Sequence, residues 1–258
     1  MRYPILAVSG ALLCGACLLA QQPAVPQQPA PNQAELNGIL MNWERVMNGI
    51  NSLVADCTRK QVDKTWATTK VYEGKAKFLK PNMASLKLTN KANPQDFEQY
   101  VCSGAEMCVW APQAKVIRVY KLLSPEAGQP QEDNFLSFLM GMKAAEALKR
   151  YQLSLLPGTP ETEKWYYYIR VLPREPKDKA DFTQARLVLL KSSYLPAQLW
   201  FEQLNGNEVY WDFTKLYTGV QLPPQEFQRP VPEPGWQLVP ADLPGAPGSG
   251  PRVIRPQN

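Results

Sequence analysis

The chain has 258 residues, of which 45% are hydrophobic and 20% charged, and its formal net charge is +5. It contains no histidine, which excludes Ser-His-Asp catalysis, Cys-His catalysis and histidine-held metal sites. The basic residues are scattered rather than clustered, so nucleic acid is not indicated as a partner, while attraction to an anionic membrane surface stays open. No metal ion and no cofactor is predicted.

Residues 1–20 have the three-part pattern of a secretory signal peptide. Arg2 precedes an apolar run over residues 5–20, which is followed by a polar segment. The run is short for a spanning helix, which needs roughly 20 apolar residues. We expect cleavage after Ala20, which removes one positive charge and leaves +4. The alternatives are a retained anchor and a lipoprotein acylated at Cys17. Either way, the pattern predicts export to the periplasm or cell envelope.

Two proline-rich segments lie on either side of a single domain. Residues 21–32 hold four prolines without periodicity, which predicts an extended linker. Residues 241–258 are rich in proline and glycine and are predicted to be a disordered tail. The segment between them, residues 33–240, is long enough for one domain with a sizeable core.

The domain opens with an amphipathic helix, predicted over residues 33–51. Its apolar residues recur at spacings of three and four and make one stripe. They are Leu36, Ile39, Leu40, Trp43, Met47 and Ile50. Such a stripe needs another element to cover it.

The next segment has the pattern of consecutive β-strands, separated by Pro-Asn, Asn-Pro, Ser-Gly and Pro-Gln turns. The expected strands cover residues 53–59, 70–80, 84–89, 97–102, 108–111 and 115–121. The short gaps between them imply antiparallel neighbours in a meander.

A second helix is predicted from a cap at Asp133 or Asn134 to Arg150. Its first half is apolar nearly all round, which is typical of a buried helix. Strands then resume, and the expected ones cover residues 151–156, 165–171, 185–191, 198–203 and 208–213.

The last two strands are predicted to form a hairpin with a tight primed turn at Asn205–Gly206, since both residues tolerate positive φ. In this hairpin Trp200 faces Trp211. Alternation places Glu202 on the face opposite Glu208, so these carboxylates do not converge as an acid and base must. No other constellation supports catalysis, and the chain is not expected to be an enzyme.

Three cysteines remain after the leader. In an oxidising compartment a pair is expected to close, and Cys102 with Cys108 is the nearest pair, across a short turn. The alternatives are a bond from Cys57 to either of them, or three free buried thiols.

These elements predict an α+β fold, an incomplete, half-open antiparallel β-barrel of about ten to eleven strands wrapped around helices. The order of elements resembles the periplasmic outer-membrane lipoprotein carrier superfamily, the LolA and LolB type. Four motifs carry the resemblance in the right order: Lys77–Met83, Tyr100–Pro112, the helix from Asn134, and Phe227–Trp236. The blocks Gly141–Ala144, Tyr166–Ile169 and Trp200–Asn207 resemble more closely an uncharacterised planctomycete domain family of the same architecture.

The resemblance implies that a helix forms a lid over a cavity for acyl chains. The residues that it places at this lid and cavity are Phe135, Leu136, Leu139, Met140, Met142, Trp43, Phe78 and Lys80. The carrier family has an arginine at the last of these positions. Lysine is a point charge without the planar fork, so the family's way of closing the lid does not carry over.

We therefore expect a monomeric carrier or chaperone for lipid, lipoprotein acyl chains or other apolar cargo. Each buried methylene contributes about 0.8 kcal/mol, so such binding needs no polar chemistry. The alternative is a non-enzymatic structural or protein-interaction domain of the envelope. An internal void would favour the carrier and a filled core the structural domain.

Overall fold

The computed structural model describes residues 33–122, 143–180 and 182–241. The first part contains α1 (Gln33–Gly49), β1 (Ser52–Asp63), β2 (Thr68–Leu79), β3 (Met83–Asn90), β4 (Phe97–Cys102), β5 (Glu106–Ala111), the 3₁₀ turn η1 (Pro112–Ala114) and β6 (Val116–Lys121). The rest contains α3 (Ala144–Arg150), β7 (Tyr151–Leu156), β8 (Tyr166–Pro173), α4 (Pro176–Lys179), β9 (Gln184–Leu190), β10 (Pro196–Glu202), β11 (Glu208–Thr218), η2 (Pro224–Phe227) and β12 (Gln237–Ala241). The predicted leader, linker, lipidation site Cys17 and most of the tail lie outside the described residues.

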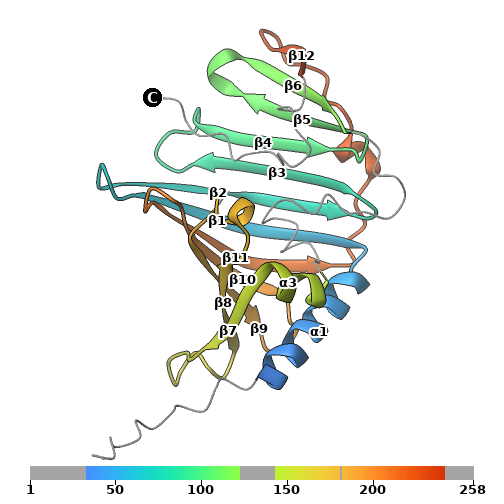
Figure 1. Ribbon diagram of the computed structural model, residues 1–258. Coiled ribbons are helices and arrows are strands. Elements are labelled where there is room, and N and C mark those ends of the chain that lie inside the picture. The colour runs from blue at the N-terminus through green and yellow to red at the C-terminus, as the bar shows by residue number, and fades with distance from the viewer. Residues whose placement is uncertain (1–32, 123–142, 181, 242–258) are drawn as a thin grey trace, which may run out of the picture. The chain divides into compact units, whose positions relative to one another are not determined.

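The described strands form one open sheet of twelve, in the order β12-β6-β5-β4-β3-β2-β1-β11-β10-β9-β8-β7 (Figure 1). Every neighbouring pair is antiparallel except β12, which runs parallel to β6. The antiparallel, incomplete barrel with helices is confirmed. The strand beyond the expected ten to eleven is β12, whose sequence Gln-Leu-Val-Pro-Ala has a proline inside it, and proline argues against a strand in a sequence pattern.

The helices cover one part of the sheet. The apolar stripe of α1 packs against the face of β7–β11 that we call the inner face, and Leu40 and Trp43 are 0% exposed there. Ala144 and Ala147 of α3 join the same core. In Figure 1, α1 and α3 lie beside β7–β11. The residues expected to form the apolar stripe of the first helix are all buried, as their spacing predicted.

The prediction of one continuous second helix is wrong at Lys143. This residue has φ −60° and ψ 138°, an extended backbone, and α3 begins only at Ala144. The backbone N–H of Ala144 donates to Oε2 of Glu44 in α1 at 3.0 Å, so a side chain from another helix satisfies a donor of the first turn. The expected start of this helix lies outside the described residues.

The hairpin between β10 and β11 has a three-residue loop, so the prediction of a primed two-residue turn is wrong. The N–H of Gln203 donates to the carbonyl of Asn207 at 2.8 Å, and the N–H of Gly206 donates to the carbonyl of Gln203 at 2.9 Å. Within this loop only Gly206 has a positive φ, of 80°, whereas a primed type I turn needs two such residues. The pairing is therefore Glu202 with Glu208 and Trp200 with Tyr210.

The expected bond between Cys102 and Cys108 does not form, and both are free, as is Cys57. Cys102 pairs with Met107, while Cys108 pairs with Val101. Directly opposite residues share a face and successive residues alternate. The two sulfurs therefore point to opposite faces of the sheet.

The C-terminal segment covers the outer face at the other end of the sheet. Val101, Cys108 and Ile117 form a small outer cluster, against which Trp236 and Leu238 pack. Phe227 of η2 is 0% exposed. Arg229 forms an ion pair with Glu106 that holds the same segment to β5.

In the part of the chain that the structure describes, no helix combines the length and the apolar character needed to cross a membrane. No group of three or more acidic or cysteine side chains among these residues is arranged to hold a metal ion.

Candidate ligand-binding face

The inner face of β2–β6 is the part of the sheet that continues beyond the helices α1 and α3 (Figure 1). Register pairs Phe78 with Ala84, Leu86 with Tyr100, and Tyr100 with Val109, which places these side chains on one face. Seven residues make up this apolar floor: Ala76, Phe78, Ala84, Leu86, Tyr100, Met107 and Val109. All but Val109 are half-buried, so the floor carries apolar surface that the described structure does not fully cover.

Of the predicted site residues, Phe78 belongs to this floor and Lys80 lies beside it. Phe78 pairs with Leu53 and Ala84 and packs at the margin of the main core. Lys80 follows β2, and its Nζ donates to the carbonyl of Asn48 in the last turn of α1, while its N–H donates to the carbonyl of Asn51 at 2.8 Å. A lysine thus satisfies a carbonyl that the helix leaves unpaired.

Trp43, the third described member of the predicted site, lies elsewhere. It is fully buried between α1 and the sheet, so it belongs to the filled core and does not line the floor. Phe135, Leu136, Leu139, Met140 and Met142 lie outside the described residues, and their role as a lid stays a prediction.

A buried ion pair that was not predicted lies at one end of the floor. The guanidinium of Arg59 in β1 donates to both carboxylate oxygens of Glu98 in β4, at 2.6 and 2.5 Å. The side chain of Arg59 is 4% exposed and that of Glu98 27%. The guanidinium also lies over the rings of Tyr72 and Trp211, 4.6 and 5.4 Å from their centroids, where cation–π attraction adds to the pair.

This position could have been found by alternation along β1. Leu53, Ala55 and Cys57 are buried and point inward, and Arg59 is the next residue of that series. A charged residue in a buried series needs a partner. The sequence does not reveal which carboxylate supplies it, because Glu98 lies three strands away in the sheet.

The surroundings of the pair suppress ionisation of neighbouring groups. Burial, with the charge of Glu98, raises the pKa of Tyr100 to about 12. Burial and the hydrogen bond from its hydroxyl to Asp96, 3.0 Å long, raise the pKa of Tyr72 to about 12. Burial also raises the pKa of the Cys57 thiol to about 11, so it is a poor nucleophile at neutral pH.

These tyrosines predict an alkaline limit of stability. The folded pKa of Tyr72 and Tyr100, about 12, lies above the unfolded value of about 10. The contribution of these two tyrosines to the free energy of unfolding is therefore complete below about pH 10, and it is lost as the pH rises toward 12. In an absorbance titration of tyrosinate, Tyr100→Phe is expected to remove a step near pH 12. Persistence of the full step near pH 12 in this variant would contradict the assignment.

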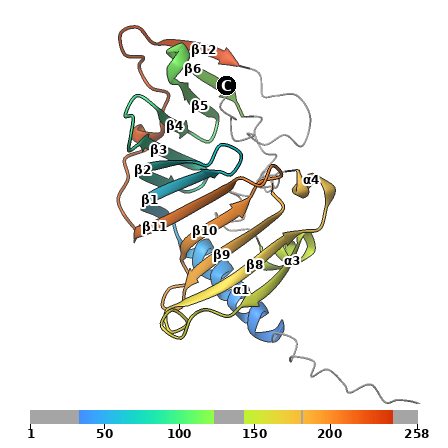
Figure 2. The same ribbon diagram turned by 90° about the vertical axis from the view of Figure 1, so that its left-hand side faces the viewer.

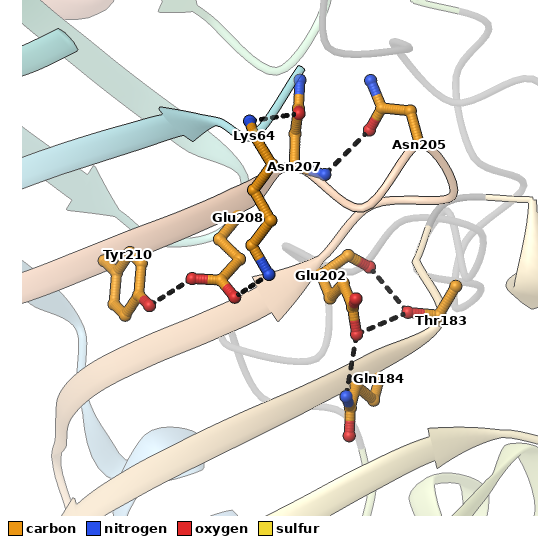
Figure 3. Close-up of polar contacts among 8 residues, drawn as sticks. All are labelled: Lys64, Thr183, Gln184, Glu202, Asn205, Asn207, Glu208 and Tyr210. Atoms are coloured by element: carbon orange, nitrogen blue, oxygen red, sulfur yellow. Dashed lines mark hydrogen bonds and ion pairs between the residues drawn. The ribbon is translucent and has the colours of Figure 1, made fainter. Parts of the chain in front are cut away.

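The outer face of the β10–β11 hairpin carries two carboxylates, and Figure 3 shows their contacts. Glu202 and Glu208 are directly opposite and share this face, so the expectation that they point apart is wrong. Glu208 lies 2.6 Å from Nζ of Lys64 and accepts a hydrogen bond from the hydroxyl of Tyr210. Lys64 holds the pKa of Glu208 below its usual range, which is the opposite of what a general acid needs.

The other carboxylate and the loop are also held by neighbours. Glu202 accepts hydrogen bonds from Nε2 of Gln184 at 2.8 Å and from Oγ1 of Thr183 at 3.2 Å. Asn207 Oδ1 accepts from the N–H of Lys64 at 3.0 Å, which ties the hairpin loop to the loop after β1 (Figure 3). The arrangement has the features of a structural polar cluster.

No family model and no curated protein matches the sequence. Among solved structures, similar ones include an uncharacterised conserved protein from Thermus thermophilus, with 11% identity over 80% of this chain and 99% of that one and a TM-score of 0.49. A LolA-superfamily protein from Nitrosomonas europaea has 10% identity over 78% and 99%, with a TM-score of 0.36. The lipoprotein LppX from Mycobacterium tuberculosis has 12% identity over 73% and 98%, with a TM-score of 0.40.

At these identities the likeness concerns the fold alone. One of these solved structures is of a protein from the superfamily that the sequence motifs resemble. The closer kinship with a planctomycete domain family stays a prediction.

Proposed function

We propose that this protein is an exported, non-catalytic binding protein that holds an acyl chain or a similar apolar group on the inner face of β2–β6. The observation that carries the proposal is the apolar floor, whose side chains, except that of Val109, are only half-buried although they point to the inner face. Burial of each methylene of a ligand there contributes about 0.8 kcal/mol. The ligands that we propose for this apolar surface are lipids and acylated proteins.

The floor is polar at one end, which gives a bound amphiphile an orientation. Leu86 and Phe78 lie toward the α1 end, and Glu98 pairs with Leu88 further along the same face. Glu98 is occupied by Arg59 on one side, and its 27% exposure leaves part of the carboxylate in contact with solvent. An apolar chain over Leu86 would therefore place its polar group near this carboxylate.

A second candidate function is a structural or protein-interaction domain of the envelope. The packing around α1 favours it, because Leu40, Trp43 and Leu187 are 0% exposed and leave the helix-covered part of the sheet filled. The two candidates differ in what the β2–β6 floor does.

Displacement of an environment-sensitive apolar dye tests the carrier function. A triacylated lipopeptide is expected to displace the dye from the full chain in a saturable way, and the unacylated peptide is not. Leu86→Asp is expected to weaken lipopeptide binding about tenfold or more, because it places a charge where a side chain worth about 1.5–3 kcal/mol was buried.

Lys87→Asp is the matched control, because Lys87 is the next residue of β3 and is exposed on the opposite face. Leu86→Ala serves if the aspartate variant fails to fold. Equal binding by all variants, or no dye uptake by the parent, would overturn the carrier function and favour the structural domain.

A further inference from the structure

A row of cationic and aromatic side chains crosses the outer face of five strands. Register pairs Arg170 of β8 with Arg186 of β9, Arg186 with Trp200 of β10, Trp200 with Tyr210 of β11, and Tyr210 with Lys60 of β1. Figure 2 shows these strands side by side. Directly opposite residues share a face, so the five side chains form one continuous line, which we call the outer row.

Contacts within the outer row run along its length. The guanidinium of Arg186 lies 5.8 Å from the centroid of the Trp200 ring. The rings of Trp200 and Tyr210 are 6.4 Å apart, and Nζ of Lys60 lies 5.5 Å from the Tyr210 centroid. Two arginines therefore stand at one end of an aromatic pair and a lysine at the other.

The two arginines are an unfavourable pair in the protein alone. Like charges directly opposite each other in a sheet destabilise it, and Arg170 is exposed while Arg186 is half-buried. Within the described residues, neither side chain has a carboxylate within ion-pair distance.

The neighbouring carboxylates already accept hydrogen bonds or form ion pairs with other side chains. Glu202 is held by Gln184 and Thr183, and Glu208 by Lys64 and Tyr210 (Figure 3). Asp212, in the next row of the same face, accepts from Nε2 of Gln198 at 2.7 Å. The positive charge of the arginine pair is therefore not neutralised by the carboxylates beside it.

A polar hydrogen at the same place also lacks an acceptor. Nε of Arg186 is buried and makes no hydrogen bond, and such a donor costs free energy until it is satisfied. The long, half-exposed side chain of Arg186 can reorient by rotation about its own bonds and present its donors to a ligand.

We propose that Arg170 and Arg186 form a site for an oxyanion, a carboxylate or phosphate group, of a ligand whose remaining part lies along Trp200 and Tyr210. The planar fork of a guanidinium matches two oxygens of such a group. One oxyanion between the two forks offsets their mutual repulsion and supplies an acceptor for the unsatisfied Nε–H of Arg186. This site is on the opposite face from the apolar floor and does not depend on the proposed carrier function.

Titration calorimetry of the full chain with inorganic phosphate and with glucuronate tests a soluble source of the oxyanion. Co-sedimentation with phosphatidylglycerol vesicles, against phosphatidylcholine vesicles, tests a lipid head group as the source. Arg170→Gln and Arg186→Gln are each expected to weaken the observed binding at least tenfold. Both variants relieve like-charge repulsion, although Arg186→Gln also loses the contact with Trp200, so both are expected to melt near the temperature of the parent, and this measurement checks that they fold.

Arg174→Gln is the matched control. Arg174 is exposed just beyond β8, and its removal changes the net charge equally. Binding of either soluble probe, or of the anionic vesicles alone, supports the site if the Arg170 and Arg186 variants lose it and the Arg174 variant keeps it. Equal weakening by Arg174→Gln, or no binding of any probe, would overturn it, and displacement of the apolar dye should be unchanged in all three variants.

Discussion

Trp43→Ala is expected to lower the free energy of unfolding by about 3–5 kcal/mol, the usual cost of truncating a large buried aromatic residue. Trp43 is 0% exposed and lies between α1 and the inner face of β7–β11, so the lost burial and the cavity left behind both add to the cost. Denaturant unfolding monitored by circular dichroism measures the loss.

Met41→Ala is the control for this variant, because Met41 lies on the same helix but is 65% exposed. Its effect should stay within about 0.5 kcal/mol. A loss below about 1 kcal/mol for Trp43→Ala would show that α1 is not docked as described.

Glu98→Gln is expected to cost about 3 kcal/mol, because it leaves the guanidinium of Arg59 buried without a compensating charge. The figure is at the low end of the usual 3–5 kcal/mol for breaking a buried pair, since Glu98 is partly exposed and solvent screens its charge. The same unfolding measurement applies. Glu73→Gln is the matched control, since it breaks a pair with Lys91 in which both side chains are half exposed and which is worth at most about 1 kcal/mol.

The double replacement Arg59→Met with Glu98→Leu separates a lost charge pair from lost packing. It removes both charges together, so it should recover most of the stability that Glu98→Gln loses. A double variant as unstable as the single one would show that the two side chains stabilise the fold mainly through their packing and not through their charges.

Secondary structure was largely predictable because local patterns determine it. The stripe from Leu36 to Ile50 repeats at helical spacing, and β4 and β7 begin and end at the residues that the turn signals indicated. The helix ending at Arg150 was predicted to start too early. Its first turn is capped by Glu44 from α1, and such a contact cannot be read from the helix's own sequence.

One extra loop residue explains three errors in the hairpin. A two-residue turn at Asn205–Gly206 would pair Trp200 with Trp211 and place Glu202 and Glu208 on opposite faces. Leu204 belongs to the loop as well, so the register shifts by one residue and each side chain of one strand changes its cross-strand partner. The Asn-Gly signal located the turn correctly but not its length.

Neither the Arg59–Glu98 pair nor the outer row was predictable from the sequence. Each depends on a register that runs across several strands, and the register of the outer row also passes an irregularity, the shift between Asp56 and Cys57 where β1 meets β11. Alternation within β1 shows which residues point inward, but the partner on another strand follows only from the sheet order.

The place of β1 in the sheet has a consequence for how the chain folds. One of its edges pairs with β2, the next strand in the sequence, but the other pairs with β11, where Leu53 meets Thr218. During synthesis from the N-terminus, β1 therefore presents an unpaired edge until nearly the whole domain has been made. Pairing across so long a separation slows folding, and an open edge is where a partly made chain associates wrongly. Protection of that edge during synthesis would thus bear on how much of the protein reaches its native state.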